Sequence, residues 1–361
     1  MASNTIAHNL KCNRMLSFLA ALLLTACSST SLIEHDASLS DKVEPLRVAI
    51  SPYQDMAMLV SEKKLGLEKK YGTKLEFLTM PWEDIISAVA SAGDSVDVGF
   101  ANLSEYMSQS EHLNSKGDDP LLYIYPAFVF HGGAFVTFNP KIPEINADNI
   151  DDPARIRKFL SRKIGVHKNC CLHMLLWFLA NKAGVKLSDI RFIDISLNDG
   201  LLAAENGTLD AAAAGLTQRT EALKRHGRVV VDMDSAHLAD ICGFICKESV
   251  YKRRKKDIEA LIRIWCDSTN YVLSDIDHHS GDALAYLKAN ASTQYTVDGF
   301  KTALSQEYFP RSISDLQTDI LSSTGKYSFE RTSKLYSNYL LDTGGTKSPP
   351  SLPKPIDLAS P

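Results

Sequence analysis

The sequence predicts an α/β protein with two lobes, each built on a mostly parallel β-sheet flanked by helices. Two stretches carry this prediction. In residues 47–109, and again in residues 163–215, short β-branched runs alternate with segments of helical periodicity. Such an alternation indicates parallel strands joined by right-handed crossovers. A chain of 361 residues is long enough for two lobes of ordinary size.

The N-terminal segment is typical of an exported protein. Lys11 and Arg14 precede an apolar run at residues 15–24, which is too short to span a bilayer and suits the core of a signal peptide. The following Leu24-Thr25-Ala26-Cys27 resembles the lipobox of bacterial lipoproteins. We therefore expect a signal peptide at residues 1–26, a lipid anchor on Cys27 and a membrane tether at residues 27–45.

Composition excludes two classes of protein. The formal net charge of −4 gives no electrostatic case for binding nucleic acid. Of seven cysteines, Cys12 would leave with the signal peptide and Cys27 would be lipidated. The remaining odd number implies at least one free thiol or an intermolecular bond, so the chain is not a disulfide scaffold. These cysteines are Cys170, Cys171, Cys242, Cys246 and Cys266.

The first lobe is expected to alternate strands and helices from residue 47 onward. Glycines at residues 66, 72 and 93 mark helix ends, and Asn102 is a good cap for the helix that follows it. The predicted strands are residues 47–50, 74–78 and 96–100, and the predicted helices are residues 56–64, 84–92 and 103–109.

The second lobe is organised around a helix at residues 170–181 that is apolar on nearly every face and therefore buried from several sides. Asn169 is its expected N-cap, and Gly184 follows its end. The other predicted elements are strands at 164–166, 190–195 and 209–214 and a short helix at 201–205. Because ligands bind at the carboxyl ends of strands in such sheets, the turn at residues 167–171 should form half of a binding site.

Two β-rich segments, residues 121–138 and 229–245, are expected to cross between the lobes. Lobe one would then comprise residues 46–130 and 242–341, and lobe two residues 131–241. Further helices are predicted at residues 250–273, 281–289, 297–307, 313–323 and 329–341, and residues 342–361 are expected to form a disordered tail.

Taken in order, these segments resemble a known family. The pieces RVAI at 47–50, KLGL at 64–67 and DVG at 97–99, with KIGV at 163–166 and GTLDA at 207–211, are similar to the substrate-binding proteins of ABC importers. The subgroup is that of the nitrate, taurine, aliphatic-sulfonate and thiamine-precursor binders, and the resemblance covers about residues 47–308. It implies a two-lobed periplasmic-binding-protein fold (type II) that closes on a small-molecule ligand. It also implies a monomer without cofactor or enzymatic activity, an ABC permease complex as partner, and a place at the periplasmic face of a bacterial membrane.

The resemblance also implies where the ligand lies, between the ends of the first strands of the two lobes. Tyr53 and Trp82 are the aromatic candidates, and short polar side chains and free N–H groups would supply hydrogen bonds. The candidate ligand-binding residues are Ser51, Tyr53, Gln54, Asp55, Trp82, Asn102, Ser104, Asn169, Cys170, Cys171, His173, Thr217, Gln218 and Arg219.

The ligand class stays open at this point, between a small organic solute and an anion. Sulfonate and taurine binders usually show small hydroxyl residues where this chain has Cys170 and Cys171, and thiols are poor hydrogen-bond donors. Arg219 would suit an anion, whereas Asp55 argues for a cationic or hydroxyl-bearing ligand.

Three alternatives are compatible with parts of the sequence. His167, Cys170, Cys171 and His173 are metal-ligand residue types, but their spacing is poor and we expect no metal. A thiamine-pyrimidine-synthase-like enzyme shares the fold; export and the absence of a longer cysteine run argue against it. A solute receptor that reports to a membrane sensor would have the same fold and site.

Overall fold

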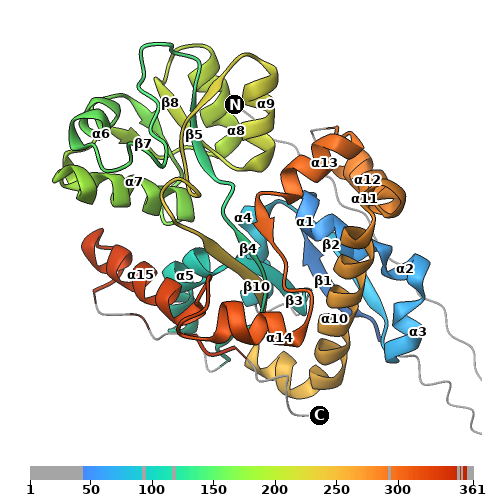
Figure 1. Ribbon diagram of the computed structural model, residues 1–361. Helices are drawn as coiled ribbons and strands as arrows, with labels where there is room; N and C mark the ends of the chain where they lie inside the picture. The colour runs from blue at the N-terminus through green and yellow to red at the C-terminus, as the bar shows by residue number, and fades with distance from the viewer. Residues whose placement is uncertain are drawn as a thin grey trace, which may run out of the picture. The chain divides into compact units, whose positions relative to one another are not determined.

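Two mixed β-sheets form the framework of the molecule (Figure 1). The computed structural model describes residues 44–91, 95–115, 119–291, 294–347, 350 and 353–355. The predicted signal peptide, the lipid anchor on Cys27 and nearly all of the tether lie outside the described residues, as does much of the predicted tail. No helix in the described part of the chain combines the length and the apolar character needed to cross a membrane.

The first sheet has six strands in the order β11-β4-β10-β3-β1-β2. β1 pairs in parallel with β2 and β3, whereas β10 lies antiparallel between β3 and β4. Its strands are β1 (Leu46–Ile50), β2 (Leu75–Thr79), β3 (Val98–Asn102), β4 (Leu121–Phe130), β10 (Asp240–Lys247) and β11 (Glu307–Tyr308).

The second sheet has five strands in the order β7-β6-β8-β5-β9. β6 pairs in parallel with β7 and β8, and β5 lies antiparallel between β8 and β9. The α/β fold class is therefore confirmed, but the sheets are mixed because the crossing strands run against those of the βαβ units. The strands are β5 (Ala134–Thr137), β6 (Ile164–Gly165), β7 (Phe192–Ile193), β8 (Ala211–Ala214) and β9 (Arg228–Asp232).

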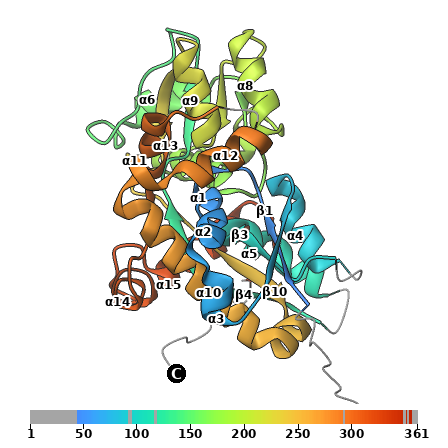
Figure 2. The same ribbon diagram turned by 90° about the vertical axis from the view of Figure 1, so that its right-hand side faces the viewer.

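Helices flank both sheets; we call each sheet with its helices a lobe. Helices α11 to α13 stand above α10 and beside α1 (Figure 2). Lobe one has α1 (Gln54–Ala57), α2 (Glu62–Leu65), α3 (Leu67–Tyr71), α4 (Trp82–Ala90), α5 (Leu103–Asn114), α10 (Glu248–Ser274), α11 (Ile276–His279), α12 (Gly281–Asn290), α13 (Val297–Leu304), α14 (Ile313–Asp315) and α15 (Phe329–Asp342). Lobe two has α6 (Pro153–Leu160), α7 (Cys171–Ala183), α8 (Leu197–Glu205) and α9 (Leu216–Lys224).

Several element predictions need correction. The helix expected at residues 56–64 is broken into α1, a 3₁₀ turn and α2, and the one expected at residues 313–323 is a single α turn followed by a π-helical turn. Cys170, in extended conformation, is the N-cap of α7, whereas Asn169 has a φ of +61° and precedes it. Asn is one of the few residues that adopt the left-handed conformation readily, which explains its place in this turn.

A cluster of aromatic rings lies in the core of lobe one. Phe100 on β3 and Phe244 on β10 pack with ring centroids 4.4 Å apart, and Trp265 of α10 meets Phe100 edge-on at 5.3 Å. Phe128 of β4 adds a fourth ring. Aromatic pairs of this geometry contribute about 0.5–1.5 kcal/mol each beyond their buried area. They fix the three central strands against α10.

The chain crosses between the lobes twice, at residues 131–133 and 233–239, and the backbone N–H of Met233 donates to Gly133 O at 2.9 Å across the two crossings. Helix α15 makes a third connection. It packs on α5 and β10 of lobe one and reaches α7 of lobe two, where the Tyr339 hydroxyl bonds to His173 Nδ1 and the Trp177 indole donates to Asp342 at 3.2 Å.

Candidate functional site

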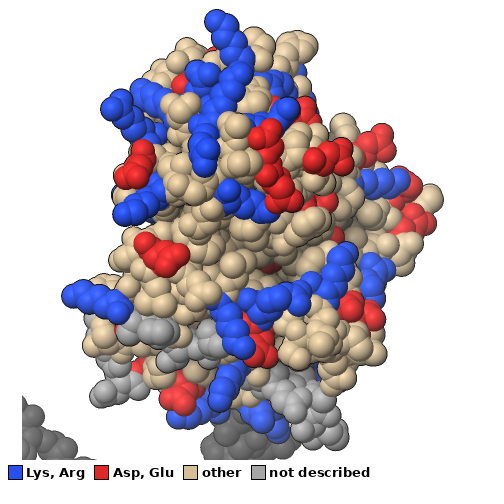
Figure 3. All heavy atoms as spheres, turned by 60° about the vertical axis from the view of Figure 1, so that its left-hand side comes forward, with Lys and Arg blue, Asp and Glu red and all other residues tan. Residues whose placement is uncertain are grey.

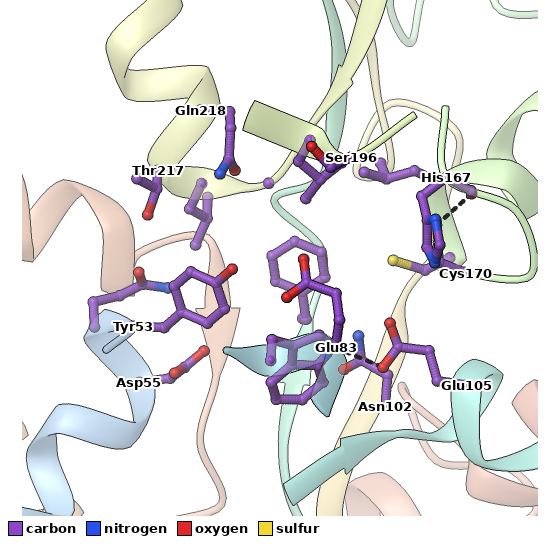
Figure 4. Close-up of a pocket in the computed structure, with 18 of the residues that line it drawn as sticks. Tyr53, Asp55, Glu83, Asn102, Glu105, His167, Cys170, Ser196, Thr217 and Gln218 are labelled. Carbon is purple, nitrogen blue, oxygen red and sulfur yellow. Dashed lines mark hydrogen bonds between the residues drawn. The ribbon is translucent and has the colours of Figure 1, made fainter. Parts of the chain in front are cut away.

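A cavity of about 370 Å³ lies between the two lobes (Figure 4). This volume is within the range of small-molecule sites in proteins. Lobe one contributes Tyr53, Gln54, Asp55, Trp82, Glu83, Asn102, Glu105, Phe128 and Phe130, and lobe two contributes His167, Cys170, Cys171, Leu172, Asp194, Ile195, Ser196, Leu197, Gly215, Leu216, Thr217 and Gln218.

Most of these residues lie at the starts of helices, and the topology explains why. Among the described helices, α1, α4 and α5 follow β1, β2 and β3, and α7, α8 and α9 follow β6, β7 and β8. In a βαβ unit the helix begins at the carboxyl end of the strand, so the first turns of all six helices meet at the same edge. The first N–H groups of a helix have no partner within it. In α8 the Ser196 hydroxyl accepts from the Asp199 N–H, and in α1 Asp55 Oδ1 accepts from the Met56 N–H.

Aromatic rings form one wall of the cavity. The rings of Tyr53 and Trp82 lie 6.4 Å apart at an angle of 48°, and the Trp82 indole donates a hydrogen bond to Glu105 Oε2 at 2.7 Å. Phe128 and Phe130 are two residues apart on β4, so their side chains point to the same face of the strand. Together they give a ligand an extensive apolar surface.

Carboxyl groups form a second feature of lobe one. Burial raises the pKa of Glu105 to about 8, nearby Asp240 adds to the shift, and the Trp82 indole opposes it. Burial also raises the pKa of Asp55 to about 6. Burial and the charge of Asp55 raise the pKa of Glu307 well above its usual range.

The wall from lobe two is mostly neutral. Burial raises the pKa of the Cys170 thiol to about 12 and that of Cys171 well above its usual range, so both thiols are protonated at neutral pH. Cys170 Sγ donates to His167 O at 3.1 Å. The N-cap residues of α7 and α9, Cys170 and Gly215, offer no side-chain hydrogen bond to their helices, which leaves the first N–H groups uncapped by side chains.

A hydrogen-bonded row of side chains links the lobes beside the cavity. Thr217 of lobe two bonds to the Tyr295 hydroxyl of lobe one at 2.9 Å, and Tyr295 in turn donates to Gln54 Oε1 at 3.3 Å. The amide of Gln54 donates to Glu307 Oε1 at 2.9 Å. Gln54 therefore connects the interlobe contact to the Asp55–Glu307 pair.

Nine of the fourteen candidate residues named from the sequence line this cavity. They are Tyr53, Gln54, Asp55, Trp82, Asn102, Cys170, Cys171, Thr217 and Gln218.

The other five candidates do not line it. Ser51 is fully buried and donates to Met80 O, and Ser104 donates to Asp240 Oδ2 at 2.5 Å. Asn169 is exposed, and His173 turns toward Tyr339. Arg219 is bound at the crossing: it donates to Gly132 O at 3.2 Å, to Gln306 Oε1 at 3.3 Å and to Asp232 Oδ2 at 3.2 Å.

Sequence reasoning missed several lining residues. Glu83 and Glu105 stand in first helical turns next to the named Trp82 and Ser104, so the rule that selected those positions also covers them. Asp194 and Ser196 follow β7 in the same way. Among the described residues, no group of three or more His, Cys, Asp or Glu is arranged to hold a metal ion.

Comparison with known proteins shows the fold. No protein-family model matches the chain, and no curated protein matches it either. Among solved structures, the periplasmic aliphatic sulphonate-binding protein SsuA of Escherichia coli aligns over 87% of this chain and 94% of its own, with a TM-score of 0.62 and 14% identity. The periplasmic nitrate-binding protein NrtA of Synechocystis aligns over 72% and 69%, with a TM-score of 0.56 and 12% identity.

A fungal protein of known structure has a similar fold. A Candida albicans gene product, described as defining a new family with the generic periplasmic binding protein fold, aligns over 87% of this chain and 99% of its own, with a TM-score of 0.60 and 15% identity. At these identities the likeness shows the fold alone. The chain has the periplasmic binding protein fold, and the resemblance inferred from the sequence is confirmed at that level.

Proposed function

We propose that this protein captures a small solute in the cavity between its lobes and delivers it to an ABC importer. The observation that carries the proposal is the convergence of six helix starts, three from each lobe, on one cavity beside a double crossing. Such a site holds a desolvated solute through free N–H groups and an apolar wall. Two neighbours are named for solutes that they bind, aliphatic sulphonates and nitrate, which supports a solute-binding role.

We further propose that Cys27 carries a lipid that holds the protein at the periplasmic face of a bacterial membrane. The proposal rests on the basic, apolar and lipobox-like order of the first 27 residues. The test is metabolic labelling with a palmitate analogue, which should label the wild type and not Cys27→Ser. Equal labelling of both proteins would refute the anchor without touching the binding role.

A ligand screen tests the binding role. A solute that binds this cavity should stabilise the fold by about 2.7 kcal/mol at a hundred times its dissociation constant, which a thermal-shift measurement detects. The shift should disappear in Trp82→Ala and persist in Leu223→Ala, a change at an exposed position outside the cavity. A shift that survives in Trp82→Ala would place the solute elsewhere.

Delivery needs a second experiment. Deletion of the gene should abolish uptake of the solute found in the screen, and cross-linking in cells should recover an ABC permease. Unchanged uptake together with a cross-linked membrane sensor would favour the receptor alternative.

A further inference from the structure

The charges that face the cavity are unevenly distributed. Asp55, Glu83 and Glu105 lie on the wall formed by lobe one, at the starts of three successive helices (Figure 4). The lining residues include no Lys or Arg, and the lining His167 stands 3.5 Å from Asp194. Basic residues are plentiful elsewhere: they gather over the outer face of the upper lobe, whereas the band between the lobes is mostly uncharged (Figure 3).

These carboxyl groups occupy the helix starts at which an anionic ligand would otherwise bind. The N-terminus of a helix carries partial positive charge and is a ready site for an anion. At α4 and α5 that charge already faces a carboxylate of the first turn, Glu83 or Glu105, and Asp55 Oδ1 accepts from the Met56 N–H in α1. An anion in the cavity would therefore face carboxyl groups on lobe one instead of unoccupied helix N-termini.

The arginine of α9 does not compensate for these carboxyl groups. Arg219 belongs to α9, the helix that supplies Thr217 and Gln218 to the lining, but its guanidinium bonds to Gly132 O, Gln306 and Asp232. Releasing it toward a ligand would break contacts at the crossing between the lobes.

The same wall is well suited to a cation. Tyr53 and Trp82 are aromatic, and aromatic faces attract ammonium and guanidinium groups. Glu83 is exposed, whereas Asp55 is 7% exposed, so the carboxylates are spread from the rim of the cavity to its floor. Across the cavity, the uncapped starts of α7 and α9 would receive an oxygen of the same ligand.

We propose that the solute is a small organic cation, an amine, guanidine or quaternary ammonium compound. Its positive group would lie among Asp55, Glu83 and Glu105, and its apolar body against Tyr53 and Trp82. The proposal rests on the solute-binding function and names the class of solute.

Charge-matched probes test it on the purified protein. One set is choline, its neutral analogue 3,3-dimethyl-1-butanol and the anion 3,3-dimethylbutanoate; the other is benzylamine, benzyl alcohol and benzoate. Ethanesulfonate and nitrate complete the panel. Calorimetry should show that the cation of at least one set binds ten times more tightly than its neutral analogue, and that the anions bind least.

Variants of two adjacent carboxylates on α4 provide the control. Glu83→Gln should weaken the cation at least fivefold and leave the neutral analogue unchanged, whereas Asp84→Asn should alter neither, because Asp84 is exposed and outside the lining. Tighter binding of any anion, or equal binding of the cation to both variants, would overturn the proposal.

The two proposals fail differently. If ethanesulfonate or nitrate binds and Trp82→Ala abolishes that binding, the solute-binding function stands and the cation inference falls. If no compound in the panel binds at millimolar concentration, the cation inference falls, and the ligand screen decides the solute-binding function separately.

Discussion

Glu105 is a carboxyl group of the cavity whose charge changes near physiological pH. Its pKa of about 8 arises first from burial and then from Asp240, and the Trp82 indole favours the charged form. In the empty cavity at pH 7, Glu105 is therefore mostly protonated. Other titratable groups that interact with it are Glu83 on α4, Tyr53 beside α1, and Cys170 and Cys171 at the start of α7.

A bound cation should draw the proton off Glu105. Because the charged carboxylate attracts the ligand, the affinity for choline should rise as the pH increases from 6.5 to about 8 and level off above that. Choline itself does not titrate. Calorimetry in two buffers of different ionisation enthalpy would count the released protons. Glu105→Gln should bind more weakly at pH 8 and lose the pH dependence in this range; an unchanged slope in the variant would contradict the assignment.

Single helical steps explain which site residues the sequence could not supply. Adjacent residues of a helix differ by about 100° in direction, so Ser104 turns to Asp240 while Glu105 faces the cavity. The sequence indicates that a first turn belongs to the site, but the rotation of the helix depends on tertiary packing. The same limit separates Thr217 and Gln218 from Arg219.

Strand β10 shows at the level of elements how tightly the central sheet is built. Gly243 lies where the pairing of β10 with β4 shifts register, and a Cβ there would collide with the Tyr123 ring and with Tyr125 O. The backbone oxygen cannot move aside without disturbing the sheet. A side chain at this position should therefore destabilise lobe one as a whole.

Gly243→Ala should lower the free energy of unfolding by about 1–3 kcal/mol, the usual cost of overpacking a core. Denaturant titration measures it. Gly281→Ala is the matched control, since a Cβ at that helix position meets nothing within 4 Å. Equal stability of the two variants would show that the sheet relaxes around the extra methyl group.

Helix α15 stabilises the contact between the lobes through a buried polar pair. His173 is 3% exposed, and its Nδ1 bonds to the Tyr339 hydroxyl. Tyr339→Phe should destabilise the protein by about 1–3 kcal/mol, because the buried ring nitrogen loses its hydroxyl partner and keeps only the Asn169 N–H, at 3.4 Å. The loss can be measured by thermal unfolding. Tyr286→Phe removes an exposed hydrogen bond between the tyrosine hydroxyl and Thr79. Its loss of stability should be only a few tenths of the loss in Tyr339→Phe.

Elements with strong local signals were predictable. The strands before residue 100 and the apolar α7 could be predicted from apolar periodicity and glycine stops, and α7 ends at Gly184 as expected. Helices α6 and α9 were missed: the sequence of α9, LTQRTEALK, carries few apolar residues and depends on packing against its sheet. The 3₁₀ turn that breaks the predicted 56–64 helix likewise follows from contacts with α10 and α12.

The molecule as a whole buries several acids that prefer to be neutral. Burial raises the pKa of Glu62 to about 7 and that of Asp240 to about 6, in addition to Glu105 and Asp55. Between the pKa in the unfolded chain and that in the folded protein, such a group binds more protons when folded. Stability therefore falls as pH rises through that window.

We expect the free energy of unfolding to decrease between pH 6.5 and about 8. Burial lowers the pKa of His173 to about 4, so below pH 6.5 this group makes stability rise with pH. The range from pH 6.5 to about 8 is free of that opposing effect. Urea titrations at half-unit pH steps would test this. Glu105→Gln should flatten the decline near pH 8. A free energy of unfolding that rises from pH 6.5 to 8 would show that the buried acids are not protonated in the folded protein.

The contacts of α15 also bear on when the protein becomes complete during synthesis. This helix is made after the other elements of both lobes, yet it packs on α5 and α7, whose first turns line the cavity. Before α15 is made, the described residues join the two lobes through the crossings and through side-chain contacts such as Thr217 to Tyr295. A newly made chain therefore acquires a fully supported cavity only after residues 329–342 have docked.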